Sequence, residues 1–329
     1  MVSDVPVGVF LSGGIDSSTV AALLQKNTGE KIQTFTIGFT DDAYNEADSA
    51  KRVAEYLDTD HHELYLDPRA ALDIIPDLPD IYDEPFGDTS GIPTFMVSRF
   101  AREHVKVALS ADGGDELFAG YAAHARLLNT WRKLSKLGPF RRAALGLADT
   151  PLARHILQKR QGSADLKVRK LKASIDGGWS KTRFFWSGRS LWTDAEIGKL
   201  LDWEFDPTTK FMAPYFDFES KTSGFIDFMR GADYRTYLAD DILVKVDRAS
   251  MAVGLESRDP FLDHCIAEFA AGLPDDLLVR NGEQKYILKQ LLYRHVPREL
   301  VDRPKSGFAV PLDVWLKGDL RNLLTDYIT

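Results

Sequence analysis

The sequence predicts an α/β protein with a parallel, doubly wound sheet and a mostly helical second lobe. Over the first 121 residues, short runs of β-branched and aromatic residues alternate with stretches that have the apolar spacing of amphipathic helices. This alternation is typical of a parallel sheet with right-handed crossovers. Between residues 122 and 235 strand signals are few, and helical patterning then continues to the C-terminus. We therefore expect an α/β core over 1–121, a helical lobe over 122–235 and a mostly helical C-terminal part over 236–329.

The elements of the expected core follow one another in a regular order. Residues 7–11 form an apolar, β-branched run, and Val20, Leu23 and Leu24 then recur at the spacing of a helix. Further strands are expected at 32–39, 61–66 and 105–109, with helices at about 47–57, 69–81 and 92–104. Ligands of such sheets bind beyond the carboxyl ends of the strands. We therefore expect residues 12–18 and the residues that follow Phe39 and Leu109 to lie along one edge.

The composition argues against several classes of protein. The chain has 329 residues, and its 41 Lys and Arg against 49 Asp and Glu give a net charge of −8, unlike a general nucleic-acid binder. No apolar run approaches the roughly 20 residues that span a bilayer, and residues 1–4 lack the basic start of a signal peptide. The single cysteine, Cys265, permits no internal disulfide and is expected to be a small packed side chain. We therefore expect a cytoplasmic protein.

The turn after the first strand has the features of a phosphate-binding loop. Gly13 and Gly14 let the backbone approach a ligand closely, and the first N–H groups of the following helix form an anion cradle with the hydroxyls of Ser12, Ser17 and Ser18. Asp16 would repel a phosphate unless a divalent cation lay between them. The alternative is an ordinary strand-to-helix turn in which small residues serve packing.

A second acidic turn follows the strand at 105–109. Asp112, Asp115 and Glu116 lie within five residues of one another beside a Gly-Gly turn, and they would repel each other without a partner. Magnesium is usually bound by one or two carboxylates together with substrate phosphates. We therefore expect Asp16 and Asp115 to hold Mg²⁺ on the phosphate groups of a ligand. The alternative, an acidic loop in solvent, is common for such a sequence taken singly.

A third segment, residues 303–308, contains a lysine between proline and glycine. Lys305 could reach into the site and neutralise charge that develops on a phosphate or on an oxyanion. Spacing alone does not place it there, and from the residues only a surface lysine is the better interpretation.

Four motifs appear in the order of a known family. Residues 12–17 match the SGGxDS signature of PP-loop ATP pyrophosphatases, and residues 110–121, 254–263 and 303–308 follow. Together they resemble the synthetase domain of the glutamine-dependent asparagine synthetase family, over nearly the whole chain. The resemblance implies a PP-loop fold whose C-terminal part completes the active site. It also implies a ligase that uses ATP and Mg²⁺ to activate a carboxylate as an acyl-adenylate, releasing pyrophosphate before ammonia attacks.

The resemblance also implies roles for individual positions. The residues expected to hold pyrophosphate and Mg²⁺ are Ser12, Gly13, Gly14, Asp16 and Ser17, with Asp115 as a further metal ligand. Those expected to line the adenosine are Phe10, Ile37, Ser110 and Ala111. Asp112 stands where the family keeps an acid that serves formation of the intermediate and handling of the ammonia proton. Lys305 would be the electrostatic stabiliser, and Glu256 and Arg258 are expected on the side of the carboxylate substrate.

The sequence departs from the family pattern at several positions. Ala111 stands where the family often has glycine, and Asp112, one methylene shorter, stands where it often has glutamate. The family carries a preceding glutaminase domain with an N-terminal cysteine, whereas position 2 is Val2. We therefore expect an excised domain, or an enzyme that takes ammonia from solution or from a separate glutaminase subunit.

Aspartate is the expected acid substrate, with ammonia as its partner and no nucleic acid or membrane. An alternative within the fold is amidation or cyclisation of another carboxylate, such as a uronic acid of a polysaccharide or the acid of a β-lactam or lasso-peptide pathway. A tRNA-modifying PP-loop enzyme would show a basic face and usually reactive cysteines, and neither is evident. A non-catalytic interaction module would show loss of the metal carboxylates, yet Asp16 and Asp115 are both present.

Overall fold

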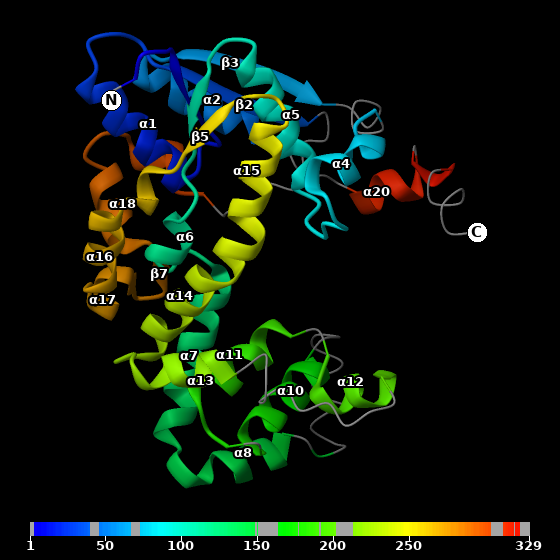
Figure 1. The fold of residues 1–329 in the computed structure, drawn as a ribbon. Helices are drawn as coiled ribbons and strands as arrows, with labels where there is room; N and C mark the ends of the chain where they lie inside the picture. Colours follow the sequence, from blue (N-terminus) through cyan, green and yellow to red (C-terminus); the bar gives the residue numbers. More distant parts are fainter. Residues whose placement is uncertain are drawn as a thin grey trace. The chain divides into compact units, whose positions relative to one another are not determined.

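A computed structural model describes residues 3–39, 46–66, 73–148, 150, 164–176, 178–190, 192–201, 213–303, 312–318 and 320–322. The chain forms two compact units, drawn in Figure 1. The first contains Met1–Phe118, Tyr234–Gly272 and Lys285–Thr329, and the second contains Ala119–Asp233 and Leu273–Gln284. Within the described residues, no helix is both long and apolar enough to cross a membrane.

The first unit is built on a five-stranded parallel sheet, which confirms the predicted fold class. Its strands are β1 (Val7–Phe10), β2 (Gln33–Phe39), β3 (Asp60–Leu66), β4 (Val107–Leu109) and β5 (Glu256–Arg258), in the order β3-β2-β1-β4-β5. The first four strands lie where the sequence predicted them, whereas β5 was not predicted as a strand. With three residues, it is too short to show a clear alternation of apolar and polar side chains.

Helices cover both faces of this sheet. Phe35, Ile37 and Phe39 of β2 pack in one hydrophobic cluster with residues of α5 (Gly91–Arg102) and α15 (Leu243–Met251). Gly38 points to the other face, where an added Cβ would lie 2.9 Å from the Cβ of Ala47 in α2 (Ala47–Leu57). Because successive strand residues point to opposite faces, α5 and α15 cover one side and α2 the other. This is the doubly wound arrangement.

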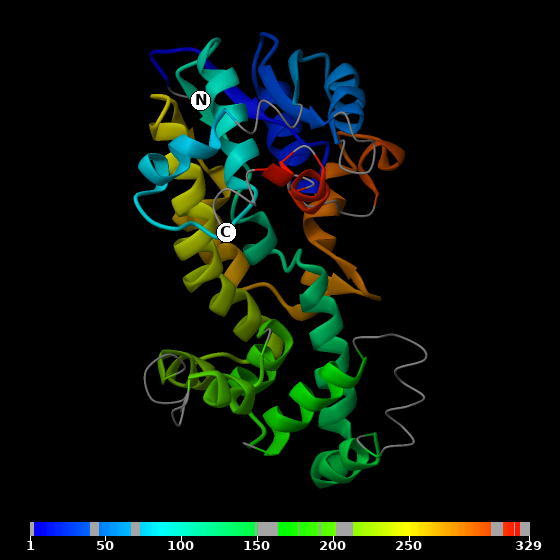
Figure 2. The same ribbon diagram turned by 90° about the vertical axis from the view of Figure 1, so that its right-hand side faces the viewer.

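The remaining helices of the first unit are mostly short. They are α1 (Ile15–Asn27), α4 (Leu78–Tyr82), α6 (Gly114–Leu117), α16 (His264–Ala271), α18 (Tyr286–Leu292), α19 (Arg298–Val301) and α20 (Leu312–Lys317), with 3-10 turns at Ile75–Asp77 and Pro260–Leu262 and a π-helix at Tyr237–Ile242. Although α1 and α18 are far apart in the sequence, they pack against each other, as the views in Figures 1 and 2 show. This contact brings the C-terminal part of the chain to the first turn after β1.

The second unit is mostly helical. Its helices are α7 (Ala122–Lys136), α8 (Arg141–Ala148), α10 (Ala164–Asp176), α11 (Lys181–Arg189), α12 (Asp194–Leu201), α13 (Ala213–Ser220), most of α14 (Phe225–Arg235) and α17 (Asp275–Leu278). Trp131 stacks on Trp179 and Phe225, with ring centroids 4.2 and 4.5 Å away, and the imidazole of His124 pairs with Asp233 at 2.7 Å in the interior. Aromatic stacking and a buried hydrogen bond between an imidazole and a carboxyl group therefore contribute to its core.

The second unit also contains a hairpin that we did not predict. Strands β6 (Val279–Arg280) and β7 (Glu283–Gln284) pair antiparallel around Asn281 and Gly282, whose φ angles are 52° and 85°. Two central residues with positive φ define the tight hairpin turn for which Asn-Gly is the preferred sequence. The Asn-Gly pair was therefore a usable signal for a turn in a region interpreted as helical.

Candidate active site

The sheet topology places three chemically important loops next to one another. In the register of the sheet, Val9 of β1 lies beside Leu109 of β4, which in turn lies beside Arg258 of β5. Because the strands are parallel, the residues that follow β1, β4 and β5 leave the sheet at the same edge. The chain order also reverses between β1 and β4, and such a switch point is where ligands of open α/β sheets bind. The predicted edge is therefore confirmed for these loops, while residues 40–45 after Phe39 lie outside the described residues.

The loop after β1 is closed by its own serines. The hydroxyl of Ser12 lies 2.9 Å from that of Ser17 and accepts a hydrogen bond from the backbone N–H of Gly14 at 3.3 Å. Gly13 has a φ of 70°, and a Cβ added to it would lie 2.7 Å from a backbone carbon of Ser49. A side chain at this position would therefore be strained and would clash with α2. Since Gly14 caps α1 without a side chain, the first N–H groups of the helix have no capping side chain.

The hydroxyl of Ser18 does not face outward as expected. Ser18 is fully buried in the first turns of α1. Its place on the inner face of the helix excludes it from an anion cradle, so that expectation was wrong.

A buried lysine joins the two aspartates expected to bind metal. The ammonium group of Lys285 forms ion pairs with Asp16 Oδ2 and, at 2.6 Å, with Asp115 Oδ1. Gly114 permits this convergence, because a Cβ at position 114 would lie 2.7 Å from Cγ of Asp16. Burial alone would lower the pKa of Lys285, but the two carboxylates outweigh burial and raise it. The lysine is therefore a fixed positive charge at the edge of the sheet.

Lys285 was missed by sequence reasoning. It lies outside the four motifs, between the hairpin and α18, and its φ is 53°. A lysine with a left-handed backbone just before a helix has no distinctive sequence signal. The packing of α18 against α1 is what brings it beside Asp16.

The third predicted motif is described only at its start. Lys305 and its neighbours at 304–311 lie outside the described residues. Arg303 is described, and its guanidinium donates hydrogen bonds to the backbone oxygen of Ser12 and to Glu46 Oε1, both at 3.1 Å. Residue 303 therefore lies beside the phosphate loop. It belongs to the quoted motif, although no role was predicted for it.

A second pair of carboxyl groups lies at the ends of β4 and β5. Ser110 donates from its hydroxyl to Asp112 Oδ2 at 2.5 Å, while the carboxyl of Asp259 is hydrogen-bonded to the same hydroxyl and accepts from the backbone N–H of Asp112. Burial, together with the charge of Asp112, raises the pKa of Asp259 to about 7. Asp259 was also missed as a site residue. Its signal was its position directly after a strand end, which was not recognised because β5 was not predicted.

The expected adenosine residues differ in their exposure. Phe10 is partly buried against the hydrophobic cluster on the α5 side, and Ile37 is 4% exposed within that cluster. Ser110 and Ala111 follow β4, and the backbone N–H of Ser110 donates to the backbone oxygen of Arg258 at 2.9 Å. The structure thus places Ser110 and Ala111 at the edge of the sheet and the side chain of Ile37 in the core.

Glu256 and Arg258 lie on the edge strand β5 and pair with each other. Arg258 Nε donates to Glu256 Oε1 at 2.6 Å, and both side chains are exposed. Glu256 pairs with Val107 at the start of β4, so it lies farther from the carboxyl end than Arg258 does.

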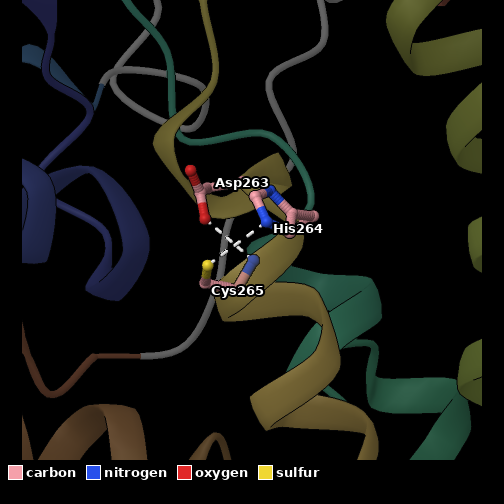
Figure 3. Close-up of side chains that lie close together, drawn as sticks. All are labelled: Asp263, His264 and Cys265. Atoms are coloured by element: carbon pink, nitrogen blue, oxygen red, sulfur yellow. Dashed lines mark hydrogen bonds between the residues drawn. The ribbon is translucent and has the colours of Figure 1, made fainter.

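A further set of metal-ligating groups lies at the start of α16. Figure 3 shows Asp263, His264 and Cys265 with their donor atoms close together, and these atoms lie within 4.8 Å of one another. Asp263 already caps the helix by accepting from the backbone N–H of Cys265 at 2.8 Å. All three are exposed and consecutive, unlike the enclosed ligand sets of structural metal sites. Cys265 is therefore not the packed side chain that we expected.

The whole chain is similar to one known family. The family model described as asparagine synthase matches residues 1–329. Asparagine synthetase (glutamine-hydrolyzing) 1 of Bacillus subtilis is 33% identical over 331 aligned residues, which cover 100% of this chain and 50% of that protein.

Two further relatives align over almost the whole chain. A putative asparagine synthetase (glutamine-hydrolyzing) of Mycobacterium bovis is 34% identical, over 96% of this chain and 47% of its own length. Amidase chyE of Penicillium rubens is 26% identical, over 99% of this chain and 52% of its own length. The chain thus spans about half the length of the curated relatives that it matches. It belongs to the asparagine synthase family.

Proposed function

We propose that this chain is an ATP-dependent, AMP-forming amide ligase that converts aspartate to asparagine with ammonia. The observation that carries the proposal is the convergence of Asp16 and Asp115 on one buried cationic group beside the phosphate loop. Family membership supports the reaction class, because its named relatives include asparagine synthetases. The amidation of aspartate by these residues is our proposal.

The loop after β1 is proposed to hold the phosphates of ATP. The hydroxyls of Ser12 and Ser17, the backbone of Gly13 and Gly14 and the N-terminus of α1 offer hydrogen-bond donors and a positive dipole to an anion. Arg303 adds a positive charge beside Ser12. These groups bind and orient the pyrophosphate portion of the nucleotide.

Asp16 and Asp115 fit a magnesium ion. Carboxylate oxygens are the hard ligands that Mg²⁺ prefers, and the structure brings two of them to one cation. When bound there, Mg²⁺ would neutralise charge on the phosphates. Lys285 contributes a second positive charge at the same place, and we propose that it stabilises the leaving pyrophosphate. Lys305 is proposed to stabilise charge that develops on the α-phosphate.

The remaining predicted residues are proposed to place the two substrates. Phe10, Ser110 and Ala111 would contact adenosine through side chain or backbone, and Ile37 would do so through the backbone of β2 because its side chain is enclosed. Arg258 would bind a carboxylate of the acid substrate, with Glu256 positioning its guanidinium.

The proposed chemistry has two steps. First, the side-chain carboxylate of aspartate attacks the α-phosphorus, an O–P bond forms, and the bond to pyrophosphate breaks. Then ammonia attacks the acyl carbon, a C–N bond forms, and the C–O bond to AMP breaks. One proton must leave the nitrogen for each amide that forms, and Asp112 is the group proposed to handle it.

The ammonia is proposed to come from solution, or from a glutaminase domain or subunit that works with this chain. This chain matches only about half the length of the relatives described as glutamine-hydrolyzing. We therefore do not assign glutamine hydrolysis to residues 1–329. Comparing glutamine with ammonium chloride as nitrogen donors for the chain distinguishes these sources.

Product analysis tests the proposal. With ATP, MgCl₂, aspartate and ammonium chloride, we expect AMP, pyrophosphate and asparagine to form in equal amounts. A parallel panel replaces aspartate by glutamate, a uronic acid and other carboxylates. Formation of ADP, or AMP formation that no acid stimulates, would show that the proposed reaction is wrong.

A further inference from the structure

Two carboxyl groups and one hydroxyl form a connected group at the ends of β4 and β5. The hydroxyl of Ser110 lies between Asp112 and Asp259 and interacts with the carboxyl groups of both. A hydroxyl has one proton and therefore cannot donate to two carboxylates at once. All three groups are satisfied when one carboxyl is protonated and donates to Ser110, which then donates to the other carboxylate.

The surroundings of Asp259 also favour a single proton shared between the carboxyl groups of Asp112 and Asp259. Its Oδ1 atom is buried and has no hydrogen-bond partner among the described residues. Burial and the charge of Asp112 both raise the pKa of Asp259, whereas its two hydrogen bonds lower it. A carboxyl that is desolvated next to a second carboxylate keeps a proton to higher pH, as in other carboxyl pairs.

Among the described residues, the charged groups around Asp259 do not offset the rise in its pKa. Its neighbour Arg258 is engaged by Glu256 on β5, and Asp263, beyond the 3-10 turn, caps α16. The influences on Asp259 from the described part of the chain are burial, Asp112 and Ser110, and none of these is a cation.

Tight packing fixes the group in place. A Cβ added to Gly113, whose φ is 88°, would lie 2.5 Å from Leu262 in the turn that follows Asp259. The backbone N–H of Ser110 is tied to the oxygen of Arg258 at 2.9 Å. The loops after β4 and β5 therefore hold Asp112 and Asp259 beside the hydroxyl of Ser110.

We propose that Asp259 shares a proton with Asp112 through Ser110 and thereby makes Asp112 the base for the amine step. Asp259 acts through Asp112, so it is a positioning residue. This inference rests on the proposed function, and it concerns the second step and leaves adenylation aside.

The proton balance of this step is simple. As the nitrogen attacks the acyl carbon and AMP leaves, the nitrogen loses one proton to a carboxylate oxygen of Asp112. The carboxylate of Asp112 is converted to a carboxylic acid, so the pair then holds two protons. Asp259 releases its own proton to solvent and receives the new one through Ser110, which restores the starting state before the next turnover. No oxidant, reductant or further co-reactant is required.

The test separates the two steps in Asp259→Asn, with Asp263→Asn as the matched control. Acid-dependent ATP–pyrophosphate exchange reports the first step, and amide formation at a fixed concentration of un-ionised ammonia reports both. For D259N we expect exchange within about 3-fold of wild type and amide formation slower by at least about 100-fold, as for loss of a general base. Wild-type amide formation should fall as the pH passes about 7, because the pair then loses its shared proton, and D259N should lack this inflection.

Three outcomes would overturn the inference while leaving the proposed function intact. They are a D259N variant with wild-type amide formation and pH profile, a D259N variant in which exchange falls as much as amide formation, and a D263N variant with the defect expected of D259N. Absence of exchange in wild type with every acid would instead sink the proposed function.

Infrared spectroscopy provides a readout that does not depend on turnover. In the difference spectrum between pH 6 and pH 8, wild type should lose the carbonyl band of a protonated carboxylic acid. Asp259→Glu, which keeps the acid, should retain this band if Asp259→Asn proves too unstable to study. A wild-type spectrum without a titrating carboxylic acid would contradict the shared proton.

Discussion

Lys285 brings a positive charge into a buried place where two carboxylates meet. Asp16 comes from the start of α1 and Asp115 from α6, and both contact the same ammonium group. Removing one partner of a buried ion pair leaves an uncompensated charge, which is more costly than never having had the pair. The contribution of Lys285 to the stability of the protein can therefore be measured separately from any reaction.

We predict that Lys285→Met lowers the free energy of unfolding by about 3–5 kcal/mol, because it leaves the partly buried carboxylates of Asp16 and Asp115 facing each other without a cation. If these carboxylates bind magnesium, MgCl₂ should restore more stability to K285M than it adds to wild type. Urea unfolding with and without MgCl₂ measures both effects. Lys289→Met is the matched control on the same helix, since it breaks a partly exposed pair with Asp302 worth at most about 1 kcal/mol. A K285M variant that magnesium does not stabilise would argue against these two ligands.

Asp259 should make stability depend on pH with a defined sign. The raised pKa, about 7 in the folded chain against an ordinary value of 3.8, means that the folded state keeps a proton that the unfolded state loses. The stability that the folded state gains by keeping this proton is fully present below about pH 4 and is lost as the pH rises through 7.

Relative to wild type, Asp259→Asn should therefore gain stability across this window, by up to about 4 kcal/mol. Urea unfolding at pH 5 and pH 8 measures the change, and Asp263→Asn should shift stability equally at both pH values. A D259N variant that gains nothing at pH 8 would show that the carboxyl ionises without penalty.

At the scale of elements, the loop between β1 and α1 depends on a backbone that only glycine adopts easily. Gly13→Ala should destabilise the protein by at least about 1–2 kcal/mol from its left-handed backbone, with an added clash against α2. It should also raise the KM for ATP in pyrophosphate exchange. Gly29→Ala is the control, since nothing lies within 4 Å of a Cβ there. If the two variants had the same stability and the same KM for ATP, the loop would not be part of the proposed phosphate site.

The sequence predicted those elements whose local signal is strong. The runs that became β1, β2 and β4 are rich in β-branched or aromatic residues. The short strand β5 and the β6–β7 hairpin were missed. Strands of two or three residues carry no measurable period, and their positions are set by pairing with β4 and by the Asn281-Gly282 turn.

At the scale of the whole molecule, the candidate site lies within the first unit. The acidic chain, with a net charge of −8, gathers Lys285 and Arg303 beside its phosphate loop. The motifs indicated Asp16, Asp112 and Asp115, because glycine turns mark loops at the ends of strands. Lys285 and Asp259 could not be predicted, because their places depend on α18 packing against α1 and on β5 pairing with β4.

Lys305 is the predicted residue whose role most needs a functional measurement, since it lies outside the described residues. If it stabilises charge on the α-phosphate, Lys305→Ala should slow pyrophosphate exchange by about 10²–10³-fold, as for removal of an oxyanion-hole donor. Lys317→Ala, at the end of α20, is a matched control. Exchange in K305A at the wild-type rate would remove Lys305 from the proposed site.

We propose that Asp16 and Asp115 together hold the metal–pyrophosphate of ATP during adenylation. The decisive measurement is acid-dependent ATP–pyrophosphate exchange in Asp16→Asn and Asp115→Asn, each at saturating MgCl₂. We expect wild type to exchange and Asp16→Asn to lose exchange altogether, with Asp115→Asn close to the same loss, while circular dichroism shows both variants folded. Exchange by a folded Asp16→Asn at the wild-type rate would show that Asp16 does not hold the metal.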